Sequence, residues 1–361
     1  MKEDIGKKTN KQFMILSALA IVFVVDAHAW SPLAIFTQFF PYNSFFMPMF
    51  VFISGYFFNI KYLDKPLVYC KKKFIKLIVP YCLIMTLFFY LMRIVTLVTP
   101  ITYTSQITMP SWFVPALFGV NISWFLFRFI LKKWWNEYVA TIVFCIVGTV
   151  CVYLSRQGLN KIEWLPVIKV GFLLQFYQIG VLYRSKIQQY FEKIPTVIIV
   201  MLTISINSIL QYLTMNKIYF NNIHTMSGFL TDIYVLPLIT SITGISFWLA
   251  ISKKLESALG ENKLVNYISN HTFTIMMFHM SFFVIYNFVI SRIPCIAKDF
   301  NFDMFYETVW YRYEPVSQLR VFYTFIGVFG PLGLYYCYDK IAKHVKLILE
   351  KHTRIKNYEK K

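Results

Sequence analysis

The residues best suited to chemistry in this sequence are ionisable side chains that stand inside long apolar runs. They are Asp26, His28, Arg93, Lys169, Asp232 and His279. A charged group in hydrocarbon is costly, so such residues usually face the interior of a helix bundle or a water-filled cavity. A neutral imidazole avoids most of this cost and still accepts a proton near pH 7, which makes His28 and His279 candidates for a general base. Either histidine could instead serve only as a hydrogen-bonding link between helices.

Position along the chain refines these assignments. His28 lies about 15 residues, or roughly 22 Å, into its helix, and His279 lies about 11 residues into another. Asp26 stands two residues before His28, so it points to nearly the opposite side of the helix and is not expected to orient that ring. We include Asp26 among the candidate catalytic residues and expect it to pair with a basic group on another helix. A purely structural ion pair would fit the same pattern.

The elements that must hold these residues are membrane-spanning helices. Hydrophobic residues make up 57% of the 361 positions and charged residues 15%, with a mean hydropathy of +0.54, whereas a soluble domain carries roughly 25% charge. Within apolar runs of about 20 residues, only helices satisfy the backbone in hydrocarbon. We therefore predict an all-α, polytopic transmembrane bundle of about ten spans, at residues 13–31, 44–60, 74–98, 112–130, 137–155, 164–183, 195–214, 229–251, 268–290 and 319–338.

The distribution of Lys and Arg predicts the orientation. Alternate connecting segments hold 27 of these residues on one side and 7 on the other, which places both termini in the cytoplasm by the positive-inside rule. The predicted regions are a cytoplasmic N-terminus (1–12), a membrane domain (13–338) and a basic cytoplasmic tail (339–361). The triplet Ala27-His28-Ala29 imitates a signal-peptide cleavage site. Asp26 is an odd neighbour for cleavage, so we expect the first span to be retained.

Charge and cysteine content argue against other classes of protein. The net charge of +19 would suit nucleic acid, but the lysines stand in short tracts between apolar runs and read as topology signals, so we predict no nucleic-acid partner. Of the six cysteines only Cys295 falls in an exterior segment, and no C-x-x-C spacing occurs. We predict neither a disulfide framework nor a metal site.

Several motifs together resemble a known family. They are Val24–Ala29, Met47–Phe58, Lys73–Tyr81, Ser111–Leu117 and Ser269–His279. Each is mostly apolar and weak alone, but the ordered set, from about residue 12 to 340 with ten predicted spans, resembles the acyltransferase-3 membrane O-acyltransferases. The resemblance is closest to the fucose 4-O-acetylase-like branch. One position departs from the pattern, because many members carry an arginine eleven residues before the first-span histidine and Ser17 stands there. Lys11, Lys76 or Arg93 could substitute, and spacing does not choose among them.

The resemblance implies a reaction. An acetyl or other short acyl group would move from cytoplasmic acyl-CoA, most simply acetyl-CoA, to a hydroxyl of a sugar on an envelope or exported polysaccharide. His28 would act as general base on the acceptor hydroxyl, and His279 would polarise the thioester, shuttle the proton or orient the acceptor. Lys73, Lys76 and Arg93 would bind the donor's phosphates, whereas Trp112 and Asp232 would contact the acceptor. The implied partners are membrane lipid, acyl-CoA, a carbohydrate acceptor and envelope-glycan synthesis proteins, and the implied location is the cell membrane.

Purely structural roles and other functional classes stay open on sequence alone. The basic tract around Lys73 and Lys76 could be purely a topology signal, and an interfacial tryptophan such as Trp112 is common without a ligand. A polysaccharide or small-molecule transporter would also place polar residues along a path through the bundle. A non-catalytic scaffold within an envelope-synthesis complex is a further alternative, since Ser17 replaces the family arginine.

Overall fold

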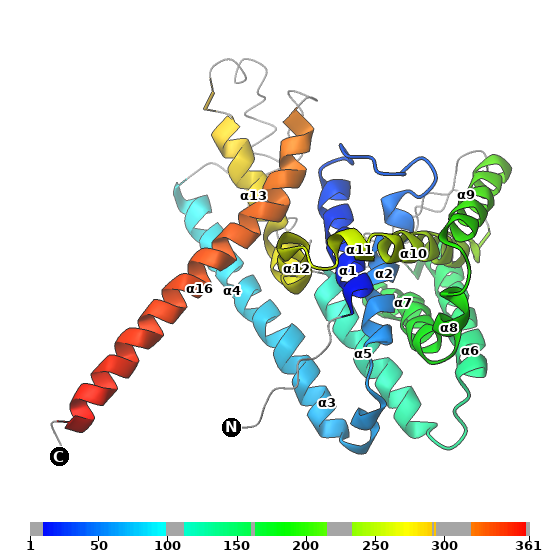
Figure 1. The fold of residues 1–361 in the computed structure, drawn as a ribbon, viewed down its shortest axis with the longest axis horizontal. Helices are drawn as coiled ribbons and strands as arrows, with labels where there is room; N and C mark the ends of the chain where they lie inside the picture. Colours follow the sequence, from blue (N-terminus) through cyan, green and yellow to red (C-terminus); the bar gives the residue numbers. More distant parts are fainter. Residues whose placement is uncertain are drawn as a thin grey trace.

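The computed structural model describes residues 10–98, 112–159, 163–214, 233–290, 292–293 and 319–358, and within these ranges every regular element is helical (Figure 1). The α-helices are α1 (Lys11–His28), α2 (Phe46–Tyr56), α3 (Pro66–Lys73), α4 (Val79–Val98), α5 (Phe113–Ile130), α6 (Glu137–Leu154), α7 (Leu165–Leu182), α8 (Gln188–Phe191), α9 (Thr196–Leu213), α10 (Leu236–Lys254), α11 (Glu256–Leu259), α12 (Lys263–Asn270), α13 (Thr272–Ile290) and α16 (Arg320–Tyr358). Short 3₁₀ turns form η1 (Tyr42–Ser44) and η2 (Ile60–Asp64), and π-helical turns form η3 (Phe74–Ile78), η5 (Ser155–Leu159) and η6 (Tyr183–Ile187).

The predicted class, an all-helical membrane protein, is confirmed for the described residues. Seven helical segments are long and apolar enough to cross a bilayer: Lys11–His28, Phe113–Ile130, Glu137–Leu159, Leu165–Phe191, Thr196–Leu213, Leu236–Lys254 and Arg320–Val345. The prediction of ten spans goes beyond this number. In the predicted span 44–60 the helix α2 has 11 residues, a rise of about 16 Å, which is roughly half the hydrocarbon thickness. The span count and the cytoplasmic placement of both termini stay predictions.

Helix α1 lies at the centre of the packing. It contacts α2, α10, α12, α13 and α16, and buried apolar side chains stand all around it, as expected of a helix enclosed by others. Its first turn is capped by Asn10, whose Oδ1 accepts from the Phe13 amide at 3.1 Å. Its last residue is His28, after which Trp30 and Ser31 take left-handed backbone conformations, with φ of 69° and 52°.

Two glycines bring α2 and α7 into backbone contact. A Cβ on Gly55 would lie 2.0 Å from the carbonyl oxygen of Tyr177, and one on Gly180 would lie 2.2 Å from that of Phe52. Only glycine permits an approach this close, as is common where membrane helices cross. The crossing fixes where the side chains of Tyr177 and the residues after Gly180 emerge.

Two predicted boundaries differ from the structure. The predicted span 268–290 is interrupted at His271, where α12 ends and α13 begins. The last helix continues past the predicted span end at residue 338 to Tyr358, so most of the predicted basic tail prolongs α16. Figure 1 shows α13 and α16 together, with the far end of α16 running out from the bundle.

Candidate active site

The histidines of the first and the late helix meet in the structure. The ring centroids of His28, at the end of α1, and His279, in α13, are 5.1 Å apart, and the rings meet edge to face at 83°. His279 is buried, with 1% of its surface exposed, whereas His28 is half-buried. The pair joins an enclosed imidazole to a more accessible one.

Main-chain carbonyls determine the tautomer of both rings. Nδ1 of His28 lies 3.1 Å from the Val24 oxygen, and Nδ1 of His279 lies 2.9 Å from the Ile275 oxygen. A carbonyl only accepts, so in each ring Nδ1 carries the hydrogen and Nε2 is the nitrogen able to take a proton. The Nε2 of His279 is buried and has no hydrogen-bond partner within the described ranges. The arrangement suits proton transfer at Nε2.

Asp26 does not orient either ring. Its carboxylate is fully buried, and Oδ1 accepts hydrogen bonds from the Thr324 hydroxyl on α16 at 2.7 Å and from the Leu33 amide at 3.3 Å. The expected basic partner is not found in the described part of the chain, because a hydroxyl occupies that place. Asp26 therefore joins α1, α16 and the segment after His28, which is a positioning arrangement.

A first cavity, of about 320 Å³, approaches the histidine pair. Its lining includes Ser17, Ser54, Lys73, Lys76, Phe113 and Met276. Met276 precedes His279 by three residues, so the cavity reaches within about one helical turn of that imidazole. Its other walls are mostly apolar, and the two ammonium groups stand on α3 and on the π-helical turn η3. π-helical turns often occur at functional sites.

The same cavity bears on the missing family arginine. Ser17 donates its hydroxyl hydrogen to the Phe13 oxygen at 2.7 Å, and Lys73 and Lys76 line the cavity beside it. Of the possible substitutes, Lys11 pairs with Glu261 instead. Lys76 is thus the substitute that the structure brings to Ser17, with Lys73 as a second cation that sequence spacing did not suggest for this role.

A second cavity, of about 440 Å³, adjoins the first because Phe57, Lys73 and Lys76 line both. It adds cations and aromatic rings: Tyr62, Tyr69, Lys72, Tyr177 and Arg184. Burial, followed by repulsion from Lys76 and Lys72, lowers the pKa of Lys73 to about 8. Three ammonium groups, those of Lys72, Lys73 and Lys76, line this cavity and make it a favourable environment for an anion.

A buried network of side chains from four helices includes Tyr69 and Tyr177, which line the second cavity. The Tyr69 hydroxyl on α3 donates to Asn121 Oδ1 on α5 at 3.1 Å and lies 3.2 Å from the Tyr177 hydroxyl on α7. Ser54 on α2 reaches the same Asn121 oxygen at 3.4 Å. The ammonium of Lys73 lies 5.6 Å from the centre of the Tyr69 ring. This buried network holds Lys73 against a rigid aromatic surface.

Of the three remaining predicted site residues, two stand on described elements. The backbone of Arg93 is on α4, 17 residues beyond Lys76, a helical rise of about 25 Å. The ring of Trp112 is half-buried and carries the ammonium of Lys169 at 4.1 Å from its centre, which occupies one face. Asp232 lies outside the described residues.

Sequence reasoning missed Arg184 and the buried network. Arg184 entered only the count of topology charges, yet it lines the second cavity and donates to the carbonyl oxygens of Tyr56 and Phe58 at 3.1 and 3.2 Å. Asn121 stands in an apolar helix as a fully buried amide. Its polar side chain inside a span was the one signal that could have pointed to the network.

Comparison with known proteins identifies the family of the chain. A family model, Acyl_transf_3, described as an acyltransferase domain, matches residues 13–336. Together with the apolar helices, the match defines a membrane acyltransferase. The chain belongs to the acyltransferase-3 family. This match confirms the resemblance to that family predicted from the sequence, and it does not favour the transporter alternative. Neither a curated protein nor a solved structure matches the chain.

Proposed function

We propose that this membrane acyltransferase transfers an acetyl or other short acyl group from cytoplasmic acyl-CoA to a sugar hydroxyl of an envelope or exported polysaccharide. We also propose that the protein lies in the cell membrane and belongs to the fucose 4-O-acetylase-like branch. Its proposed partners are envelope-glycan synthesis proteins. One observation carries it: His279, whose ring contacts that of His28, lies one helical turn from Met276 in the lining of a mostly apolar cavity that two lysines also line. Transfer from a phosphate-bearing thioester requires a base, an anion site and apolar walls around the reacting group.

The donor would enter through the cationic cavities. Lys73 and Lys76 line both the first and the second cavity, so they would hold the donor's pyrophosphate, and the acyl end would extend along the first cavity toward Met276. Phosphate binding by such cations is charge-assisted and therefore strong. The apolar walls would exclude water from the thioester, which limits hydrolysis before the acceptor arrives.

The chemical step follows from the tautomer of the rings. Nε2 of His28 accepts the proton of the acceptor hydroxyl while its oxygen attacks the thioester carbonyl carbon, which forms a tetrahedral intermediate. The carbon–sulfur bond then breaks, and the leaving thiolate takes the proton back from the imidazolium. His279, held 5.1 Å away, would orient the acceptor or polarise the carbonyl. Trp112 would offer its remaining face to the sugar, and Asp232 stays a proposed acceptor contact.

Purified protein tests the proposal directly. Incubated in lipid nanodiscs with acetyl-CoA and glycan fragments from the envelope, it should release free CoA thiol and form an acetyl ester that mass spectrometry detects. Envelope glycans from cells that lack the gene should lose the same ester. Thiol release without any esterified glycan would point to a different acceptor. No reaction and no CoA binding would overturn the proposal.

A further inference from the structure

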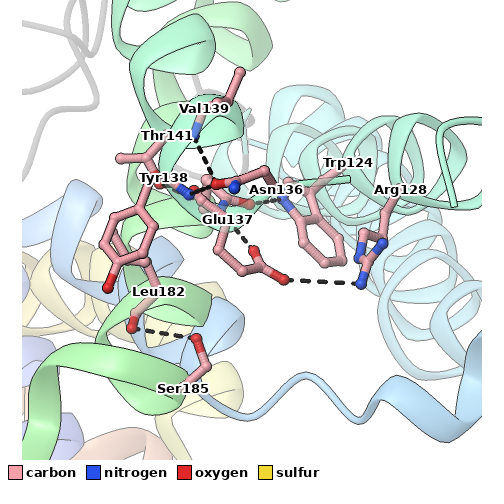
Figure 2. Close-up of polar contacts among 10 residues, drawn as sticks. Trp124, Arg128, Asn136, Glu137, Tyr138, Val139, Thr141, Leu182 and Ser185 are labelled. Atoms are coloured by element: carbon pink, nitrogen blue, oxygen red, sulfur yellow. Dashed lines mark hydrogen bonds and ion pairs between the residues drawn. The ribbon is translucent and has the colours of Figure 1, made fainter. Parts of the chain in front are cut away.

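A third cavity, of about 300 Å³, lies beyond the second. It is lined in part by Asn59, Trp124, Arg128, Glu137, Arg184 and Ser185. Figure 2 shows several of these side chains, with the guanidinium of Arg128 directed toward the carboxylate of Glu137. Phe58, Asn59 and Arg184 also line the second cavity, so the three cavities adjoin in sequence. Cations stand at both junctions: Lys73 and Lys76 at the first, Arg184 at the second.

Arg128 has an unusual environment for a guanidinium. Its side chain is 12% exposed, its nearest carboxylate oxygen, on Glu137, is 3.8 Å away, and its planar group lies 4.9 Å from the centre of the Trp135 ring. A separation of 3.8 Å is too long for a hydrogen bond. Its N–H groups therefore have no acceptor within the described ranges, whereas an enclosed guanidinium normally finds several.

Glu137 is held away from Arg128 by other groups. The amide nitrogen of Gln178 donates to Glu137 Oε2 at 2.9 Å, and the Trp124 indole donates to the Gln178 oxygen at 2.8 Å. This chain of bonds across α5, α6 and α7 fixes the carboxylate near Arg128 without pairing the two closely. A loosely paired guanidinium can accept an anionic ligand at little cost.

Arg184 is fixed at the junction of the second and third cavities. Its Nη1 donates to the carbonyl oxygens of Tyr56, the last residue of α2, and of Phe58, two residues further on, and its guanidinium lies 5.7 Å from the centre of the Tyr56 ring. One nitrogen bears the structural bonds, which leaves the rest of the fork for a ligand. Arginine suits phosphate because its planar fork matches two oxygens at once.

We propose that the three cavities form one track for the acyl donor, and that Arg128 and Arg184 bind the ribose 3′-phosphate, at the end of CoA remote from the acyl group. The inference rests on the proposed function. CoA is an extended molecule with its thioester at one end, a pyrophosphate in the middle and a phosphate monoester on the nucleotide. The track presents the same order: an apolar cavity near the histidines, a junction with two lysines, and a third cavity with two guanidinium groups. Glu137 would limit the affinity, so that CoA leaves after transfer.

The test compares acetyl-CoA with acetyl-3′-dephospho-CoA as donors for the full-length protein in nanodiscs. One charge-assisted contact corresponds to a change of about ten-fold or more in affinity, so the KM for the dephospho donor should be about ten-fold higher. Arg128→Gln should bring the two KM values together by weakening only the natural donor. Glu137→Gln should widen the gap, because it removes a negative charge beside the phosphate while its amide oxygen can still accept from Gln178. A merely structural role would not produce this opposite change.

A matched control removes a cation at the same end of the bundle. Lys132 pairs at 3.4 Å with Asp64, is 58% exposed and lines none of the three cavities, so Lys132→Gln should leave the ratio of KM values unchanged. Equal KM values for the two donors in the wild type, or an undiminished ratio in Arg128→Gln, would overturn the inference while the acyl transfer itself stands. If Arg128→Gln changed the KM values only in nanodiscs that contain anionic lipid, the inference would also be overturned. Absence of transfer from either donor would instead overturn the proposed function.

Discussion

His28 and His279 take their orientation from their own helices, whereas the cations of the cavities take theirs from neighbouring ones. Each imidazole bonds to the carbonyl four residues earlier in its helix. Lys73 lies against Tyr69, which is held by Asn121 and Tyr177 on two other helices. Each imidazole is thus oriented locally, whereas the cations are oriented by contacts between helices. Changes at the histidines should alter the chemical step alone, while changes around the cavities should alter donor binding and stability together.

The sharpest test of this contrast is loss of the proposed base. His28→Ala should lower kcat by about 10²–10⁴-fold, the usual contribution of a positioned general base, with donor affinity nearly unchanged. His279→Ala should have a smaller effect if the ring only orients the acceptor. Steady-state kinetics and CoA binding measure both. His271→Ala is the control, because that ring makes the same kind of bond, to Tyr267 at 2.7 Å, but packs against Tyr335. Comparable losses in all three variants would mean that the histidines are structural.

The second prediction concerns the crossing that assembles the cation site. Gly180→Ala places a methyl group against the Phe52 carbonyl, and overpacking of this kind costs about 1–3 kcal/mol. Thermal unfolding in detergent should show a lower midpoint, with weaker donor binding because Arg184 follows in the same helical segment. Gly333→Ala is the control, because a Cβ there meets nothing within 4 Å. Equal midpoints for the two variants would contradict the close crossing.

The third prediction, with a smaller expected effect, tests whether Lys73 and Lys76 bind an anion or serve only as a topology signal. Replacing both Lys73 and Lys76 with Gln should raise the KM for acetyl-CoA about ten-fold, as expected for loss of charge-assisted contacts, and leave the KM for the acceptor unchanged. Lys71→Gln removes one positive charge from the same segment, but that exposed side chain lines none of the three cavities. If Lys71→Gln matched the double variant, the tract would be a topology signal only.

The smallest predicted effect is a pH dependence. The pKa of Lys73 is lowered to about 8, so its ammonium is charged below that pH and loses its proton above it. The kcat/KM for the donor, which reports groups of the free enzyme, should therefore fall as the pH rises through about 8. Lys73→Arg should abolish this alkaline decline, because a guanidinium stays charged throughout. A decline that persists in Lys73→Arg would assign it to another group.

The class of fold could be predicted from sequence because the signal is local. A span is a continuous apolar run, and helices such as α5 and α9 lie within the predicted limits. Boundaries were less predictable where apolar character continues through a break. His271 interrupts an apolar stretch, and α2 ends at Tyr56 although the apolar residues Phe57 and Phe58 follow. Composition does not record where the backbone leaves the helix.

The candidate site was predictable only in part, for the same reason. The histidines stood out by residue type inside apolar runs. Arg184 and Asn121 did not, because their importance depends on which helices meet, and that follows from the backbone contacts at Gly55 and Gly180. Arg93 was grouped with the lysines by charge alone, although one helix separates it from Lys76 by about 25 Å.

The bonds between each imidazole and its own helix have a consequence for turnover. Any movement of α1 relative to α13 during the entry of the proposed acceptor would carry the rings with their helices. Because Val24 holds His28 and Ile275 holds His279, each ring would travel with its helix and keep both its tautomer and its aim. The reorganisation energy of restoring the base before the next cycle is then small, which is the advantage of a preorganised catalytic group. A base oriented from another helix would have to be realigned each time.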